Sequence, residues 1–395
     1  MEDLKYPNDK GTIDFDDVGQ ESDDDLKGLS PDQFRDAVLW GTDWTTETVL
    51  NQLRKKNIQL NPRFQRRDAW DEIKKSKFIE SLILGLPVPP IILAESKDKR
   101  GAYIVIDGKQ RLLSIMQFSA TENDTGFKKL YLKGIEILPK SFKKKNYEEI
   151  TSDNEISDYL TQYDNQAIRT VVIRNWPDEK FLFTVFYRLN TGSLKLSSQE
   201  LRQALHPGPF IDFADDFSSK PEIQETLGLS KPDSRMRDVE IIIRYFAFKN
   251  FLKEYTGNLK IFLDESCKNF NKNWEVNKDQ YEEQGKQLLE AINLSKKIFT
   301  KKNVFNKYQK ADFTGKFNRP VFDIMVYYFS DPQIRKLTEG KENAIKEKFI
   351  ELCKENEKFF ESFGSSTKDK DKTTERYRTW GKELGKILNY KIDHI

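Results

Sequence analysis

The sequence predicts an α+β protein, in which an N-terminal α/β domain precedes a mainly α-helical domain. One observation is the run YIVIDGKQRLLSIMQF at residues 103–118, where a β-prone apolar stretch passes through an Asp-Gly turn into apolar residues at helical spacing. Another is that segments after Pro209 show helical spacing, with no internal repeat. We expect an acidic segment at 1–30, the α/β domain at 31–205 and the helical domain at 206–395.

The composition indicates a globular protein with a heavily charged surface. Of the 395 residues, 33% are charged, while 28 Phe and 15 Tyr can fill a core. No apolar run approaches the roughly 20 residues that a membrane helix needs, and the acidic N-terminus does not look like a secretory signal. We therefore expect a cytoplasmic protein without a membrane partner, with Cys267 and Cys353 reduced.

The net charge of +2 is unevenly distributed. Residues 1–30 hold ten acidic and three basic residues, a charge of −7, which leaves +9 on the remainder. The acidic segment is either a solubilising tail or a mask over the basic body. A moderately basic body permits nucleic-acid binding without requiring it.

Several classes of site are excluded by the scarcity of histidine and by missing motifs. Only His206 and His394 occur, so an HExxH zinc site and a Cys/His zinc cluster cannot form. The sequence also lacks GxSxG, GxGxxG and the GxxxxGK[ST] phosphate loop. Any nucleotide site must therefore use another architecture.

Periodicity and turn residues predict the elements in order. The expected strands are 91–93, 102–106, 131–138 and 168–174, with an irregular excursion at 139–165. In the first domain the expected helices are 45–57, 71–84 ending at Gly85, 178–189, and one from a capping box at 197–200 to residue 205. In the second they are 212–217, 238–255, 259–270, 280–299, 320–329, 342–358 and 373–388.

The start of the helix after Gly108 is the first candidate site. A helix start presents free backbone N–H groups and the positive end of the helix dipole, which favour an anion. Lys109 and Arg111 add positive charge there, and Arg can hold a phosphate with two hydrogen bonds. Asp107 either caps the helix or helps to hold a phosphate-bound metal.

Two polar segments are candidates for the same site. Arg63, Gln65 and Arg66 lie between aromatic residues, a pattern found in phosphate and base contacts and also in ordinary solvated loops. Asn190 and Thr191 form a polar turn between two predicted helices, which either has a purely structural role or faces the site.

Five motifs in order carry a resemblance to a known family. The motifs NPRFQR…W, GLPVPPIIL, IDGKQRLLSI, FYRLNTGSLKLSSQELR and RMRDVEIIIR resemble the GmrSD-type restriction N-terminal domain family, whose signature turn reads DGQQR. The resemblance covers roughly residues 57–248. It implies a ParB/sulfiredoxin-like fold for the N-terminal domain. Its relatives are anti-phage proteins of the GmrSD and SspE kind, which bind and hydrolyse nucleoside triphosphates to control cleavage of modified or foreign DNA.

The resemblance implies roles for particular residues. Asp107, Gln110 and Arg111 would be catalytic, and Mg²⁺ would accompany the nucleotide through ligands that the sequence does not identify. With the two polar segments, the predicted nucleotide-binding set is Arg63, Gln65, Arg66, Gly108, Lys109, Arg111, Ser114, Asn190 and Thr191.

The sequence departs from the family pattern at three points, and these departures leave more than one function open. Lys109 stands where the family usually has Gln, Ser114 where it usually has Thr, and the C-terminal His-Asn-His nuclease domain is missing. We therefore expect a nucleoside triphosphatase that acts with DNA or a separate nuclease. The sequence does not determine its oligomeric state. The alternatives are a non-enzymatic DNA-binding sensor and a nuclease that uses the ParB-like pocket itself.

Overall fold

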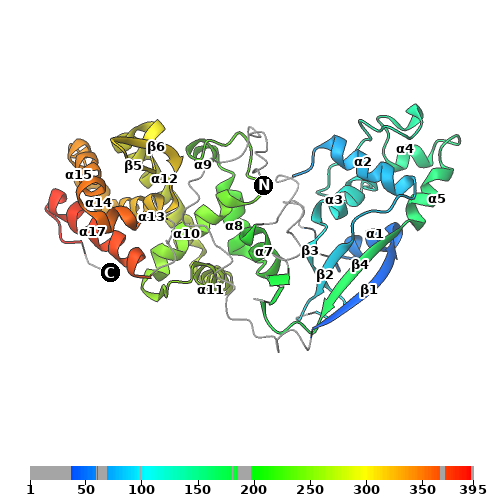
Figure 1. The fold of residues 1–395 in the computed structure, drawn as a ribbon, viewed down its shortest axis with the longest axis horizontal. Coiled ribbons are helices and arrows are strands. Elements are labelled where there is room, and N and C mark those ends of the chain that lie inside the picture. The colour runs from blue at the N-terminus through cyan, green and yellow to red at the C-terminus, as the bar shows by residue number, and fades with distance from the viewer. Residues whose placement is uncertain are drawn as a thin grey trace. The chain divides into compact units, whose positions relative to one another are not determined.

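The computed structural model describes residues 37–58, 60, 69–97, 99–179, 181–182, 184–185, 197–364 and 370–392. The chain divides into two compact units (Figure 1), an N-terminal unit, Leu26–Leu196, and a helical unit that includes Ser197–Ile395. The α+β class is confirmed, because the N-terminal unit contains a four-stranded sheet and the other unit is mainly helical. The domain boundary at 205/206 stays a prediction. Among the described residues, no helix is long and apolar enough to cross a membrane.

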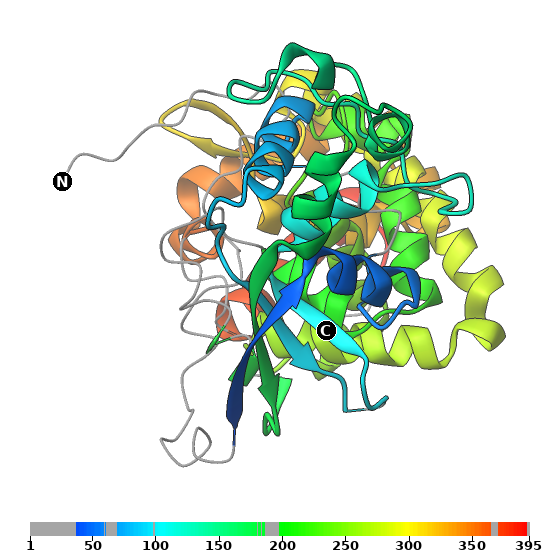
Figure 2. The same ribbon diagram turned by 90° about the vertical axis from the view of Figure 1, so that its right-hand side faces the viewer.

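The sheet of the N-terminal unit consists of β1 (Val38–Thr45), β2 (Ile91–Glu95), β3 (Tyr103–Asp107) and β4 (Ala167–Arg174). The strand order is β1-β4-β2-β3, and β4 is antiparallel to β1 and parallel to β2. Figure 2 shows these strands side by side. The antiparallel register of β2 and β3 shifts between Ile92 and Leu93, which pairs Asp107 with Ile92. The end of β3 therefore lies beside the beginning of β2.

Within the described ranges, the α-helices that accompany the sheet are α1 (Thr46–Arg54), α2 (Glu72–Ile83), α3 (Lys109–Phe118), α4 (Tyr147–Thr151) and α5 (Asp158–Asn165). Side-chain caps begin two of the predicted helices, because Thr45 accepts a hydrogen bond from the Thr48 amide and Asp71 from the Lys74 amide. Apolar side chains of α1, α2, α3 and α5 pack with those of the sheet into one core. This core holds α3 against α1 and α2, and so positions both ends of α3.

Two predictions for the N-terminal unit are wrong. Residues 131–138 do not form a strand. The backbone N–H groups of Glu136, Ile137 and Leu138 instead donate to the buried carboxylate of Glu80 on α2, over 2.7–3.1 Å. The excursion at 139–165 is also more regular than expected, since it contains the short 3₁₀ helix η4 (Lys140–Phe142) as well as α4 and α5.

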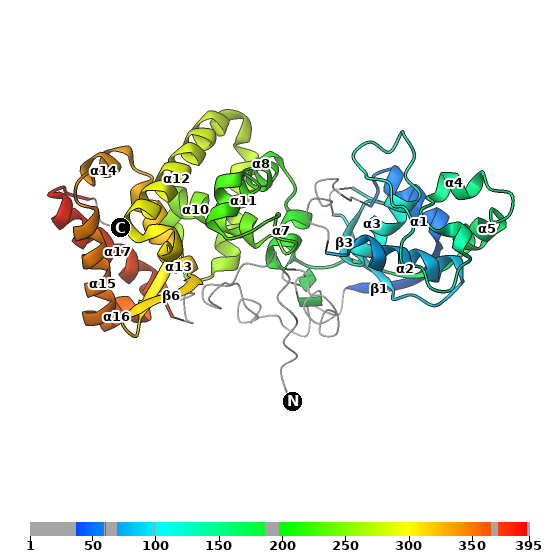
Figure 3. The same ribbon diagram turned by 90° about the horizontal axis from the view of Figure 1, so that it is seen from above.

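The helical unit begins at the predicted capping box, in which Ser197 and Glu200 bond reciprocally at the start of α7. A hairpin of β5 (Asn306–Gln309) and β6 (Asp312–Phe317) interrupts the helices. This hairpin was not predicted from the sequence. Figure 3 shows α10, α12 and α13 packed side by side. The helices and one 3₁₀ segment are α7 (Ser198–Leu205), α8 (Pro209–Ser218), α9 (Pro221–Thr226), α10 (Arg237–Phe251), η6 (Leu252–Glu254), α11 (Leu259–Lys272), α12 (Trp274–Asn303), α13 (Arg319–Phe329), α14 (Pro332–Leu337), α15 (Glu342–Glu355), α16 (Glu357–Glu361) and α17 (Lys370–Leu388).

Candidate functional site

Gly108 joins β3 to α3 by a one-residue turn. Its φ of 100° and ψ of 8° lie in the left-handed region, which glycine adopts without steric penalty. A Cβ at this position would stand 3.2 Å from Cγ1 of Ile91 and 3.3–3.4 Å from two guanidinium nitrogens of Arg111. Glycine therefore lets the strand, the helix start and Arg111 approach one another closely.

The first turn of α3 has the features of an anion-binding helix start. Its N-cap is Gly108, no side chain caps it, and its first turn contains no acidic residue. The backbone N–H groups at the start of a helix have no intrahelical partner, and the helix dipole makes this end positive. Capping by Asp107, one of the two roles considered from the sequence, does not occur.

Arg111 is held in place by two contacts of one guanidinium nitrogen. This nitrogen donates to Oδ2 of Asp107 at 2.6 Å and to the carbonyl oxygen of Pro90 at 2.9 Å. Only 10% of the Arg111 side chain is exposed, against 28% of Asp107. The Nε of Arg111 is buried and makes no hydrogen bond to any described residue. A buried donor without a partner is unfavourable, so Arg111 has hydrogen-bonding capacity that an added acceptor would satisfy.

Gln110 connects the helix start to the segment that precedes α2. Its Oε1 accepts a hydrogen bond from the Trp70 amide at 3.4 Å. The Trp70 ring packs on Phe78 with centroids 5.8 Å apart, and Nζ of Lys74 lies 5.0 Å from its centroid. The chain that follows the predicted arginine segment is therefore anchored at the first turn of α3.

Lys109 and Ser114 are both buried. The Ser114 hydroxyl donates to the carbonyl oxygen of Gln110 at 2.7 Å, one turn earlier in α3. It therefore supports the helix start from within, and donation of a hydrogen bond to a ligand would require this bond to break.

The remaining predicted site residues lie outside the described residues: Arg63, Gln65, Arg66, Asn190 and Thr191. Within the described ranges, no group of three or more His, Cys, Asp and Glu side chains could hold a metal ion. His206 is buried at the end of α7, and His394 falls outside the described ranges.

The described geometry brings together Asp107, Gly108, Gln110 and Arg111. This arrangement can attract an anion through the helix start and through Arg111. The guanidinium group of Arg111, however, is already paired with the carboxylate of Asp107. An incoming phosphate would therefore compete with Asp107 for the same guanidinium group. The sequence did not indicate this pairing or the contact with Pro90, although the Pro-rich break at 86–90 marks the segment that supplies the carbonyl oxygen.

Comparisons with known proteins give one match. A family model described as "GmrSD restriction endonuclease, N-terminal domain" matches residues 47–207, a range that contains the whole described part of the candidate site. No curated protein and no solved structure gives a significant match. The likeness to the ParB/sulfiredoxin fold stays a prediction.

Proposed function

We propose that the chain binds a nucleoside triphosphate at the start of α3, because residues 47–207 match the family model of the GmrSD restriction endonuclease N-terminal domain. The match supports a role in a restriction or anti-phage system. We propose further that the bound nucleotide regulates cleavage of foreign DNA, with a separate nuclease as partner. The supporting observation is an uncapped helix start beside a buried Arg111 that has an unsatisfied Nε.

In this proposal each residue at the turn has a distinct task. The first-turn N–H groups and Arg111 hold phosphate oxygens, while Lys109 adds positive charge from within the unit. Gln110 orients the attacking water or the ribose. Arg63, Gln65, Arg66, Asn190 and Thr191 complete the nucleotide contacts, and Ser114 supports the helix start.

Mg²⁺ is part of the proposal, since it neutralises the charge of transferred phosphoryl groups. Asp107 fits such an ion as a single carboxylate ligand, because Mg²⁺ bound to phosphates usually keeps several waters and takes only one or two carboxylates from the protein. Asp107 would be available for this role once a phosphate group replaces it on Arg111.

The decisive experiment compares Arg111→Ala with the parent. Losing a charge-assisted hydrogen bond, worth about 1.5–3 kcal/mol, should weaken nucleotide binding roughly 10- to 100-fold. Binding is measured by calorimetry, and phosphate release from each of the four nucleoside triphosphates is measured with and without DNA. Arg169→Ala is the matched control, because Arg169 lies on β4 with 60% of its side chain exposed and pairs only with Asp43 among the described residues.

A second variant separates binding from hydrolysis. Asp107→Asn removes the charge that competes for Arg111, so without Mg²⁺ we expect nucleotide affinity at least equal to the parent's, and with Mg²⁺ we expect phosphate release to be lost. Parental affinity in Arg111→Ala would refute the site assignment. Weaker binding in Asp107→Asn than in the parent, both measured without Mg²⁺, would refute the competition between Asp107 and phosphate.

A non-enzymatic DNA-binding sensor is the second candidate, favoured by the +9 charge of residues 31–395. In that case the same cations contact the DNA backbone, and affinity falls steeply as salt is added. Salt-sensitive DNA binding without phosphate release under any condition would select this candidate.

A further inference from the structure

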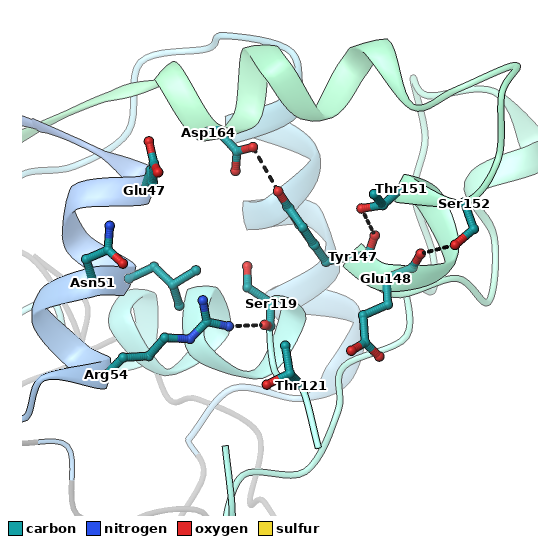
Figure 4. Close-up of a pocket in the computed structure, with 11 residues that line it drawn as sticks. Glu47, Asn51, Arg54, Ser119, Thr121, Tyr147, Glu148, Thr151, Ser152 and Asp164 are labelled. Carbon is teal, nitrogen blue, oxygen red and sulfur yellow. Dashed lines mark hydrogen bonds between the residues drawn. The ribbon is translucent and has the colours of Figure 1, made fainter. Parts of the chain in front are cut away.

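A hollow of about 500 Å³ lies in the N-terminal unit, at the opposite end of α3 from Gly108 (Figure 4). Its walls come from α1, from the residues after α3, and from α4 and α5. The ten residues of α3 separate it from the helix start by about 15 Å. Its size falls within the range of small-molecule sites, roughly 300–1,000 Å³. This hollow is therefore distinct from the proposed nucleotide site.

Three carboxylates line the described part of the hollow, and one of them, Glu148, pairs with Lys129 at 2.5 Å. Glu47 on α1 and Asp164 on α5 form no ion pair with any described residue. The one arginine on its walls, Arg54, is already engaged, because it donates to the Asp124 carboxylate at 3.0 Å and to the Ser119 carbonyl oxygen at 2.8 Å. The hollow is thus suited to a positively charged ligand.

Asp164 occupies an unfavourable position for a carboxylate. It lies in the last turn of α5, where the helix dipole disfavours negative charge and where no basic residue compensates. Its described contact is the hydroxyl of Tyr147, which donates to Oδ2 at 2.8 Å. Burial raises the pKa of Asp164, and the negative charge of Glu47 raises it further. A bound cation would remove much of this penalty.

The wall beside Asp164 is aromatic and rigid. The Tyr147 ring packs edge-on against Phe118, with centroids 6.0 Å apart, and at a tilt against Tyr163, with centroids 5.9 Å apart. Leu50 adds an apolar surface between Glu47 and Arg54 on the same face of α1. Figure 4 shows Tyr147 directed towards Asp164, across from α1. An aromatic ring and an aliphatic side chain next to carboxylates suit an alkyl chain that ends in a cationic group.

We propose that this hollow binds an organic cation with a primary ammonium or guanidinium group. Asp164 and Glu47 are its counter-ions, and Tyr147 and Leu50 contact its apolar part. The group belongs either to a free polyamine or to a basic side chain of a partner protein. This site does not depend on the proposed nucleotide site.

The test is calorimetric titration of the full chain at low ionic strength with two probes, spermidine and N-acetyl-lysine methylamide. We expect one of them to bind, and Asp164→Asn to weaken that binding at least tenfold. Asp158→Asn is the matched control, because Asp158 is an exposed aspartate at the start of the same helix and should leave binding unchanged. Arg111→Ala should also bind the cation normally, whatever happens to its nucleotide affinity.

Glu47→Gln keeps the test decisive if Asp164→Asn folds poorly. Glu47 is exposed in the first turn of α1, so its substitution should leave the fold intact and weaken cation binding several-fold. Binding of spermidine alone identifies a polyamine site, and binding of the lysine probe identifies a site for a partner's side chain. Binding of neither probe, or equal affinity in parent, Asp164→Asn and Glu47→Gln, overturns the proposal.

Discussion

At the scale of single residues, Gly108 and Arg111 depend on each other. The left-handed turn at Gly108 directs the chain from β3 into α3, and the absent Cβ leaves room for the Arg111 guanidinium group. Arg111 in turn links Asp107 at the end of β3 to Pro90 just before β2. The left-handed backbone at Gly108 and the position of the Arg111 charge therefore depend on each other.

We therefore expect Gly108→Ala to destabilise the protein and to weaken nucleotide binding together. A left-handed conformation costs a non-glycine residue about 1–2 kcal/mol, and the new Cβ would also crowd Ile91 and Arg111. Gly101→Ala is the matched control, because its φ is +76° and a Cβ there would meet nothing within 4 Å. Urea denaturation and calorimetry should show a larger loss of stability in Gly108→Ala and a loss of affinity in that variant alone. Equal effects of the two substitutions would contradict this account.

At the scale of elements, Glu80 determines the conformation of residues 136–138. Glu80 is 5% exposed, and its carboxylate accepts hydrogen bonds from three successive backbone N–H groups. In a β-strand, such groups bond to a neighbouring strand. One side chain of α2 thus takes the place of a strand partner and holds this segment against the core.

Replacing Glu80 by Gln should destabilise the N-terminal unit by about 1–3 kcal/mol, because Oε1 accepts from all three N–H groups and a neutral amide oxygen accepts more weakly than a carboxylate oxygen. Glu136→Gln is a suitable control, since 68% of the Glu136 side chain is exposed, and we expect it to leave the unfolding midpoint unchanged. Urea denaturation, monitored by circular dichroism, gives the unfolding midpoints of both variants. A parental midpoint in Glu80→Gln would show that the carboxylate is dispensable.

At the scale of the whole molecule, buried ion pairs join helices of the helical unit. Asp264 on α11 accepts hydrogen bonds from Arg202 on α7 at 2.6 Å and from Lys260 at 2.8 Å. Arg244 on α10 pairs with Asp323 on α13, and the side chains of both are at most 1% exposed. Removing one partner of such a pair leaves an uncompensated buried charge.

Asp264 should make the stability of the protein depend on acidity. Burial by itself raises the pKa of Asp264, but the charges of Arg202 and Lys260 outweigh it and hold the pKa below its ordinary value of 3.8. The unfolded chain therefore takes up a proton first, so the contribution is complete above about pH 4 and is lost as the pH falls through the folded pKa.

We expect Asp264→Asn to be less stable than the parent by about 3 kcal/mol or more at pH 7, and the difference to shrink below pH 4. Urea denaturation between pH 7 and pH 3 measures it, with Asp279→Asn, an exposed aspartate of α12, as control. A constant difference across this range would mean that Asp264 does not titrate as described.

Local signals explain which parts of the fold and site could be predicted. The strand–Gly108–helix order and the Ser197 capping box depend on neighbouring residues alone, and both are confirmed. Strand β1 escaped prediction because it begins with three successive apolar residues, Val38, Leu39 and Trp40, so apolar and polar side chains do not alternate along it. The hairpin of β5 and β6 turns through Lys310 and Ala311, which adopt positive φ without the Gly or Asn that usually signals such a turn.

The sequence by itself determined the α+β class, the glycine turn and the concentration of charge at the start of α3, because these follow from residues close together in the chain. Only the tertiary structure decided how those charges are paired. Arg111 reaches a carbonyl oxygen 21 residues earlier, and Glu80 reaches amides more than 50 residues later. The hollow beside Tyr147 likewise combines α1, α4 and α5, which no local pattern connects. Contacts of this kind arise only when the core brings distant segments together.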